Sequence, residues 1–398
     1  MRVWLGLPRS SGLEVPNLPA QLERRFLRIE EYERSTRDAW GCWDHSFSEN
    51  FGDGRLAVPE VDRWLVKRRR ELSARTKLAP LWPNGKRFAA CLTHDVDILS
   101  GRATLGQAFR HAAGGLDRGS AARDPLRYAR PPVRAARVLR GGVSRSPSME
   151  RTLELSTALE SRYGATASYF FTVPPNGGGS RYDCTYALTD RCRFRRSRTT
   201  VAHVIRALAD EGFDVGLHGS YFSAVKQGML AAERETLERA VGITAMTTRQ
   251  HFLHWQITLT PGLQEAAGFV ADSTLGFNRA AGYRASTTLP FRPFDVMADR
   301  GFTLLEVPLV VEDTALLGPI AVGGPQSPQD AVRAFVDTAR EVGGAVTLLF
   351  HPDKLVRPEW LALYEWSLEY LAEMGGWLTS VAELERWWTA RERQLLAP

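Results

Sequence analysis

The stretch THDVD, at residues 93–97, carries the clearest chemical signal in this chain of 398 residues. It follows the apolar run FAACL at residues 88–92, which is typical of a buried β-strand. Asp95 and Asp97 stand two residues apart, so in an extended backbone their side chains point to the same side. Two carboxylates on one side repel each other unless a cation or a shared proton lies between them. The stretch therefore predicts a reactive or metal-binding site at the end of a strand.

Further along the chain, predicted strands are again followed by polar residues that can bind a metal or move a proton. These residues are His218, Arg249, His251, Asp272 and His351. In a β/α barrel the carboxyl ends of the strands meet at one face, which carries the active site. An open doubly wound sheet gathers its ligand at one switch point instead. Five polar strand ends therefore favour an α/β fold of the distorted (β/α) barrel type, closed or nearly closed.

The apolar pattern alternates between strand and helix lengths, which is typical of a parallel sheet covered by helices. Strands are expected at residues 88–93, 167–171, 214–217, 245–248, 269–271, 303–307 and 345–350. Helices are expected at residues 149–163, 199–211, 227–241, 260–267, 330–342 and 358–373, after two earlier amphipathic helices at 22–37 and 61–78.

Two regions stand outside this alternation. Residues 1–85 form a weakly patterned N-terminal accessory segment, and the barrel domain is expected to span residues 86–398. Within it, a basic insertion at about residues 98–148 is rich in arginine and poor in acidic residues. Solvated charge explains the insertion, and contact with phosphate groups or a membrane surface is the alternative. Few aromatic residues are interleaved with the arginines, which disfavours nucleic acid as a partner.

The composition is that of a globular protein, with 44% hydrophobic and 24% charged residues and a net charge of +6. Four cysteines in a chain of this length do not form a disulfide framework. The first residues lack the apolar core of a signal peptide, and no apolar run is long enough to be a transmembrane segment. We therefore expect a cytoplasmic protein.

With these motifs in this order, the chain resembles the polysaccharide deacetylases of the NodB-homology type, carbohydrate esterase family 4. The resemblance covers residues 86 to about 385 and indicates a divergent subgroup with THDVD as its first motif. In that family one aspartate of the first motif is the general base and the second binds the metal. The resemblance implies that Asp95 is the base and Asp97 a metal ligand, with His218 as a second ligand.

One family position is not matched. The second motif of the family is His-x-x-x-His, and here the second histidine is replaced by Phe222. His251 is the best substitute, and substrate binding or a role in the core are its alternatives. Asp97, His218 and His251 would give a two-His-one-Asp site with an open position, which suits zinc. Cobalt, nickel and manganese are the alternative divalent metals.

The resemblance also assigns the proton-transfer residues. Arg249 matches the third-motif arginine, which orients the catalytic aspartate. His351 matches the fifth-motif histidine, the general acid, and Asp272 matches the fourth-motif aspartate that holds this histidine. A carboxylate partner would raise the pKa of His351 toward the range that a general acid needs.

Three further residues are expected to contact the substrate. Arg284 and Phe291 lie in two aromatic and basic loop segments, at residues 282–286 and 290–294, which would suit a sugar ring. Ordinary loop packing explains these segments equally well. Tyr169 lies in the strand predicted at 167–171, where a backbone N–H would help to stabilise an oxyanion; a backbone N–H in the loop around Tyr182 is the alternative.

The expected function is that of a metal-dependent hydrolase that removes an N-acetyl, or another N-acyl, group from an amino sugar in a polysaccharide or its precursor. A substrate made inside the cell, such as a lipid-linked or nucleotide-linked precursor, fits the expected location and would involve peripheral membrane contact. Two alternatives remain, a hydrolase of a non-sugar C–N bond on the same barrel and an inactive carbohydrate-binding homologue.

Overall fold

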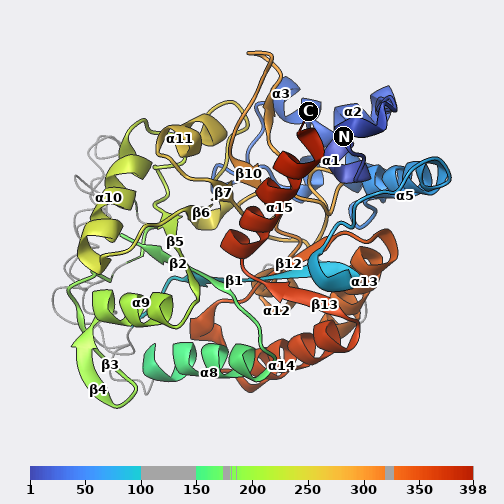
Figure 1. Ribbon diagram of the computed structural model, residues 1–398. Coiled ribbons are helices and arrows are strands. Elements are labelled where there is room, and N and C mark those ends of the chain that lie inside the picture. The colour runs from blue at the N-terminus through green and yellow to red at the C-terminus, as the bar shows by residue number, and fades with distance from the viewer. Residues whose placement is uncertain (100–148, 174–179, 181, 185, 319–326, 398) are drawn as a thin grey trace.

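The structure is a computed structural model that describes residues 1–99, 149–173, 180, 182–184, 186–318 and 327–397 (Figure 1). Its centre is a nine-stranded parallel sheet in the order β10-β7-β6-β5-β2-β1-β12-β11, with β13 also paired to β1. The strands are β1 (Phe88–Val96), β2 (Ser168–Thr172), β5 (Asp214–Gly219), β6 (Thr247–Gln250), β7 (Ala271–Asp272), β10 (Leu305–Glu306), β11 (Val311–Glu312), β12 (Ala345–Leu349) and β13 (Gly376–Thr379). The basic insertion predicted at residues 98–148 lies almost entirely outside the described residues.

The sheet curls into a partial barrel, which confirms the prediction of a distorted (β/α) barrel. Its two edges, β10 and β11, are joined by residues 307–310. The N–H of Val307 donates to the carbonyl of Asp272, and the N–H of Val310 donates to the carbonyl of Thr347. The chain itself therefore spans the gap between the edges.

Helices cover the outside of the sheet (Figure 1). They are α8 (Met149–Arg162), α9 (Val201–Asp210), α10 (Met229–Val241), α11 (Thr260–Ala266), α12 (Asp313–Leu317), α13 (Pro328–Val342) and α14 (Pro358–Glu373). Two short antiparallel pairs lie apart from the main sheet, namely β3 (Arg191–Phe194) with β4 (Ser197–Thr200), and β8 (Phe294–Asp295) with β9 (Arg300–Gly301).

Alternate residues of each strand face different cores. In β1, Ala90 and Leu92 belong to the large core under the outer helices, whereas Ala89 and Cys91 belong to a second core inside the barrel. The inside is tightly filled: a Cβ on Gly216 would lie 2.5 Å from Thr247 Oγ1. This alternation decides which polar side chains reach the site.

The last helix, α15 (Val381–Leu396), covers the amino ends of the strands. The N–H of Val381 donates to the Ser168 hydroxyl at the start of β2, and the N–H of Ala382 donates to the Asp214 carboxylate at the start of β5. This end of the barrel is therefore closed by helix, and the opposite end carries the polar residues.

The N-terminal segment contains α1 (Arg2–Leu5), α2 (Ala20–Phe26), α3 (Ile29–Glu33), α4 (Glu49–Gly52) and α5 (Glu60–Ser73), with short 3₁₀ helices η1 (Arg9–Ser11), η2 (His45–Phe47) and η3 (Pro83–Gly85). Its apolar residues share the inner core with the barrel and α15. The helix predicted at 22–37 is wrong in extent, because Arg28 adopts a left-handed φ of 53° and divides it into α2 and α3.

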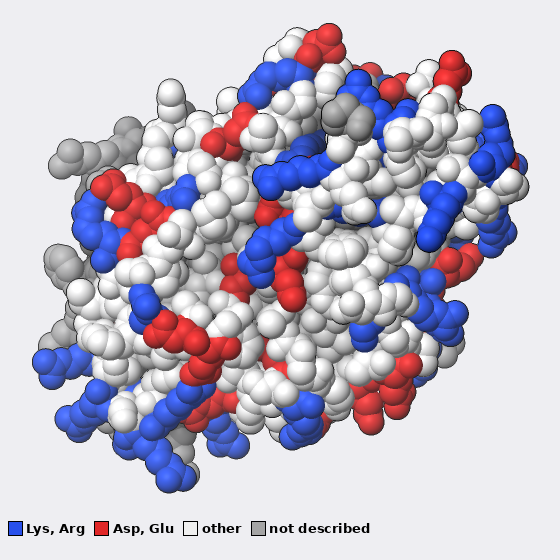
Figure 2. Space-filling model, viewed as in Figure 1, with Lys and Arg blue, Asp and Glu red and all other residues white. Residues whose placement is uncertain are grey.

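No described helix combines the length and the apolar character that a bilayer crossing requires. On the face drawn in Figure 2, basic and acidic side chains are interspersed rather than gathered into a single basic patch.

Candidate active site

A cavity of about 270 Å³ opens at the carboxyl ends of the strands. Asp95, Asp97, His218, His251 and His351 all line it, so the structure brings together five of the residues that the sequence singled out. Asp95 comes from β1 and His218 from β5, while His251 begins the 3₁₀ helix η6 (His251–Leu253) directly after β6. The titratable side chains of three separate strand ends therefore converge on this cavity.

Asp97, His218 and His251 offer three ligand atoms that all lie within 4.8 Å of one another. The Nδ1–H of His218 donates to the backbone carbonyl of Arg249 at 3.0 Å, so Nε2 is the nitrogen that the neutral imidazole can offer to a metal. That Nε2 lies 3.4 Å from Asp97 Oδ1. Oxygen and nitrogen ligands of a tetrahedral zinc ion lie roughly 3.4 Å apart, so the spacing of this pair is that of two ligands of one divalent metal.

The electrostatics of the three residues agree with a cation site. Burial alone would raise the pKa of Asp97, but the neighbouring His251 and His218 outweigh it and lower that pKa. Burial lowers the pKa of His251, which favours the neutral imidazole that metals bind. Burial would also lower the pKa of His218, but Asp95 and Asp97 raise it, so this ring sits in a strongly negative environment.

Phe222, at the position of the unmatched family histidine, does not line the cavity. The ammonium group of Lys226 lies 4.3 Å from the centre of its ring. The ring of His251 instead stacks on that of His218, with centroids 4.8 Å apart. The structure thus brings His251, and not residue 222, to the donor set.

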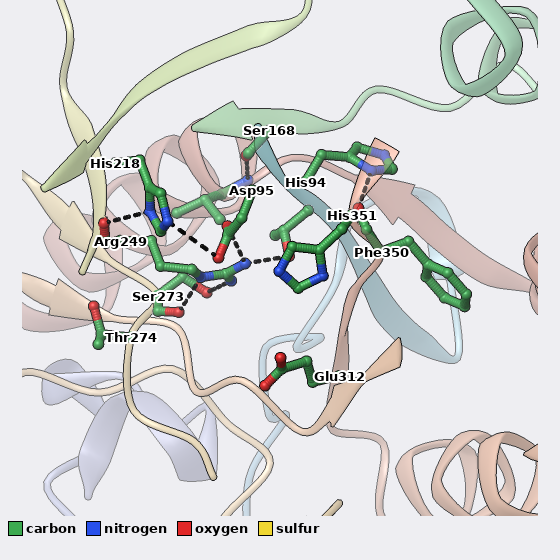
Figure 3. Close-up of polar contacts among 12 residues, drawn as sticks. His94, Asp95, Ser168, His218, Arg249, Ser273, Thr274, Glu312, Phe350 and His351 are labelled. Atoms are coloured by element: carbon green, nitrogen blue, oxygen red, sulfur yellow. Dashed lines mark hydrogen bonds and ion pairs between the residues drawn. The ribbon is translucent and has the colours of Figure 1, made fainter. Parts of the chain in front are cut away.

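Arg249 holds Asp95 in a fixed orientation. Its guanidinium group donates to Asp95 Oδ1 at 3.2 Å and to the Thr93 hydroxyl at 2.7 Å, and it is fully buried. Two more bonds, to the backbone carbonyl and the hydroxyl of Ser273, fix the guanidinium itself. Asp95 Oδ2 faces His218 Nε2 at 3.7 Å (Figure 3), so one carboxylate oxygen is held and the other points to the donor set.

His351 is held by Asp313, and the prediction that Asp272 does so is wrong. Asp313 Oδ1 accepts a hydrogen bond from His351 Nδ1 at 2.8 Å, and Oδ2 accepts one from the His351 backbone N–H at 2.9 Å. Burial and the nearby Lys354 lower the pKa of His351, but Asp313 outweighs them and raises it to about 9. The opposite nitrogen, Nε2, lies 3.8 Å from Asp97 Oδ2.

Asp272 points away from the site because of strand alternation. Its neighbour Ala271 faces the inner core, so the Asp272 side chain lies on the outer face of β7. There it accepts a hydrogen bond from the hydroxyl of Thr274 and lies beside Glu306 of the paired strand. Burial, and then the Asp272 carboxylate, raise the pKa of Glu306, because a second negative charge beside a buried carboxylate is unfavourable.

None of the three residues predicted to contact the substrate has a side chain that lines the cavity. Tyr169 lies on the outer face of β2, where its hydroxyl bonds to Ser156 and Glu160 of α8. Arg284 is buried and pairs with Glu31 of α3 through two hydrogen bonds of 2.9 and 2.8 Å.

Phe291 packs edge-on against Phe26 of α2, with ring centroids 4.9 Å apart, and is buried in the inner core. Like Arg284, it therefore attaches the N-terminal segment to the barrel and does not reach the cavity.

Sequence reasoning missed several residues at or beside the cavity, including Glu312, Asp313, Trp40 and Cys184. Glu312 and Asp313 follow the apolar run at residues 307–311, and the pattern of polar residues after an apolar run, which marked the other strand ends, would have marked them too. Burial raises the pKa of Glu312 to about 7. Trp40 reaches the cavity from the N-terminal segment, and Cys184 lies beside the donor set; no sequence pattern marked either.

Trp40 and Phe252 form an aromatic wall of the cavity, with ring centroids 6.4 Å apart. The loop that carries Trp40 is fixed by Tyr221, whose hydroxyl donates to the Trp40 carbonyl at 2.6 Å. Phe252 and Leu253 both adopt left-handed φ values, of 59° and 48°. Such backbone is costly for residues with large side chains and concentrates at functional sites.

Several solved structures are similar to the structure of this chain. No protein-family model matches the chain, and no curated protein sequence matches it significantly. Among solved structures, a protein assigned as a polysaccharide deacetylase in Mycobacterium smegmatis matches at 20% identity and a TM-score of 0.49, over 81% of this chain and 96% of that one. PuuE allantoinase matches at 17% identity and a TM-score of 0.45, over 79% and 94%.

A third structure, assigned as a polysaccharide deacetylase in Pseudomonas aeruginosa PAO1, matches at 17% identity and a TM-score of 0.44, over 79% of this chain and 95% of that one.

Proposed function

We propose that the chain is a metal-dependent hydrolase that removes an N-acyl group, in the first instance acetyl, from an amino sugar. One observation carries the proposal: a carboxylate, Asp95, and a carboxylate-held imidazole, His351, both adjoin the donor set of Asp97, His218 and His251. A general base and a general acid beside a cation site are the groups that amide hydrolysis requires.

The metal would be held by Asp97, His218 and His251, and when bound it would polarise the amide carbonyl and lower the pKa of water. Asp95 takes the proton from the attacking water through Oδ2, because Oδ1 is held by Arg249. His351 presents Nε2 toward the cavity and donates its proton to the leaving amine. Asp313 keeps His351 protonated at neutral pH and fixes the ring through Nδ1.

The amino-sugar substrate is proposed from the motif resemblance and from the cavity wall. The aromatic faces of Trp40 and Phe252 offer an apolar surface on which a sugar ring can stack. We place the reaction in the cytoplasm, on a lipid-linked or nucleotide-linked precursor of a polysaccharide, with zinc as the first metal to be tried.

The test is release of acetate from N-acetylated glycans by the zinc-loaded full chain, compared with Asp95→Asn and His218→Ala. Asp95→Asn should abolish acetate release while the bound metal is retained, whereas His218→Ala should lose both. Acetate release that persists in Asp95→Asn would refute the role of the base.

The same assay separates the two alternatives. Turnover of non-sugar amides with no turnover of glycans would favour a different C–N hydrolase on this barrel. Glycan binding without turnover, by a protein that holds stoichiometric metal, would favour a carbohydrate-binding homologue.

A further inference from the structure

Glu312, at the end of β11, places a buried carboxylate in the wall of the active-site cavity. The preceding residue, Val311, belongs to the large core under the outer helices, so strand alternation turns the Glu312 side chain to the inside of the barrel. Glu312 is only 7% exposed. Neither proton transfer of the proposed reaction uses it.

Within the described residues, only one of the two carboxylate oxygens of Glu312 has a hydrogen-bond partner. Oε1 accepts a hydrogen bond from the hydroxyl of Thr314, which also lines the cavity. Oε2 is buried and has no partner in the part of the chain that the structure describes. Because a buried carboxylate oxygen without a donor is costly, Oε2 is suited to a donor group that a ligand brings into the cavity.

Glu312 lies beside the proposed general acid. One oxygen of Glu312, one oxygen of Asp313 and a ring nitrogen of His351 all lie within 4.8 Å of one another. Asp313 is bound to His351 through both of its oxygens, whereas Glu312 lines the cavity. In Figure 3 the Glu312 carboxylate points into the site, on the side where the His351 ring lies. Glu312 is therefore the carboxylate that a ligand meets next to His351.

We propose that the Glu312 carboxylate stabilises the positive charge that the leaving amine acquires. The proposal rests on the proposed function and adds to it a catalytic residue that the motifs do not predict. In the reaction the C–N bond breaks and the water oxygen forms the new C–O bond. At neutral pH both protons of the water end on the nitrogen, so the products are acetate and an ammonium group.

The charges of the site favour this role. The nitrogen becomes positive next to His351, because it receives its proton there. Burial raises the pKa of Glu312 to about 7 against the opposing effect of the cationic His351, so a further positive group in the cavity favours the ionised carboxylate. A fixed charge in a site that excludes water interacts more strongly with a developing charge than it would in solution. The same contact should make the site prefer a free amine over a hydroxyl group.

The first experiment measures binding and needs no turnover. Isothermal titration calorimetry on the zinc-loaded full chain at neutral pH compares methyl glucosaminide, which carries an ammonium group, with methyl glucoside, which carries a hydroxyl at the same carbon. Wild type should bind the glucosaminide at least about 10-fold more tightly. Glu312→Gln, which removes the charge and keeps the shape, should bind both equally. The matched control, Glu365→Gln, changes a carboxylate that pairs with Arg162 on the surface and should keep the preference.

The second experiment measures acetate release from N-acetylated glycans. Glu312→Gln should lower kcat at least about 10-fold and leave KM unchanged, because the nitrogen of the intact amide carries no charge. Zinc content and the circular dichroism spectrum of the variant should match those of wild type. An unchanged kcat in Glu312→Gln would overturn the role of Glu312 in the reaction.

The binding experiment separates this inference from the proposed function. Equal binding of the two glycosides by wild type would overturn the inference, and this comparison does not depend on the folding of any variant. A preference that persists in Glu312→Gln would also overturn it. A preference that Glu312→Gln removes, in a wild-type protein that releases no acetate, would support the ammonium site and refute the proposed function. Failure of folded wild type to bind either glycoside would overturn both.

Discussion

At the scale of single residues, the Asp313 carboxylate opposes burial and Lys354, both of which lower the pKa of His351. Together with Asp97, it raises that pKa to about 9. A general acid with a raised pKa is protonated below that pKa and loses its proton as the pH rises through it. Activity of the wild-type protein should therefore fall as the pH rises through about 9.

Asp313→Asn should move this alkaline loss of activity to lower pH, because the neutral amide no longer stabilises the imidazolium. The measurement is kcat as a function of pH for zinc-loaded protein. Asp272→Asn is the control and should leave the alkaline limb in place, since Asp272 lies on the outer face of β7. A shift in Asp272→Asn without a shift in Asp313→Asn would contradict the assignment.

The residues that sequence reasoning placed correctly share one property: they stand at strand ends after long apolar runs. Asp95, His218 and His351 are examples, because burial of the run makes the strand and its end visible in the sequence. Tyr169 and Asp272 were placed wrongly, because a residue at a strand end faces either the inner or the outer core. A shift of one position reverses that choice, and nothing in the sequence alone fixes it.

At the scale of elements, α3 is attached to the barrel by a buried ion pair. Glu31 receives two hydrogen bonds from Arg284, and Arg28 lies 3.6 Å from the same carboxylate. Removing one partner of a buried pair leaves an uncompensated charge and typically costs about 3–5 kcal/mol.

Glu31→Ala and Arg284→Met should each reduce the free energy of unfolding by about this amount, and the double variant should lose less than the sum. Urea unfolding of the two single variants and the double variant measures the coupling. Additive losses would mean that the two side chains do not interact as described.

The N-terminal segment contributes the side chain of Trp40 to the wall of the cavity. Trp40→Ala should raise KM for a glycan roughly 2- to 12-fold, which corresponds to about 0.5–1.5 kcal/mol for an aromatic contact. Metal content should stay unchanged, since Trp40 contributes no ligand. Trp366→Ala is the matched control, because Trp366 stacks on Tyr370 on the outer helix α14 and not in the cavity.

Long helices were predicted more accurately than short strands, because only a long element carries a repeating apolar pattern. The sequence predicts the ends of helices α9, α10, α13 and α14 to within a few residues, because their apolar faces repeat over several turns. The two-residue strands β10 and β11 are too short to carry a period, and α12 directly follows β11. The apolar residues 307–311 nevertheless precede Glu312 and Asp313 directly, so this strand end was visible in the sequence and was overlooked.

At the scale of the whole molecule, the donor set joins segments that are far apart in the sequence. Asp97 follows β1, His218 ends β5 and His251 follows β6. A metal that binds only the folded chain stabilises it, by about 2.7 kcal/mol when the free metal is at 100 times its Kd.

Zinc should therefore raise the unfolding midpoint of chelator-treated wild type, and the rise should grow with zinc concentration. Thermal unfolding followed by circular dichroism measures it. His218→Ala should show no such rise, whereas Asp313→Asn should show it in full. An equal rise in His218→Ala would mean that zinc binds elsewhere.

The first and last helices lie side by side. Arg391 of α15 donates to the carbonyl of Val3 in α1 at 3.1 Å, and both chain ends lie at the same edge of the molecule (Figure 1). A short glycine-rich linker could therefore join residue 397 to residue 1, and new ends could be opened in an exposed loop. Such a circular permutant would keep every strand pairing of the barrel while changing the order in which the strands are synthesised.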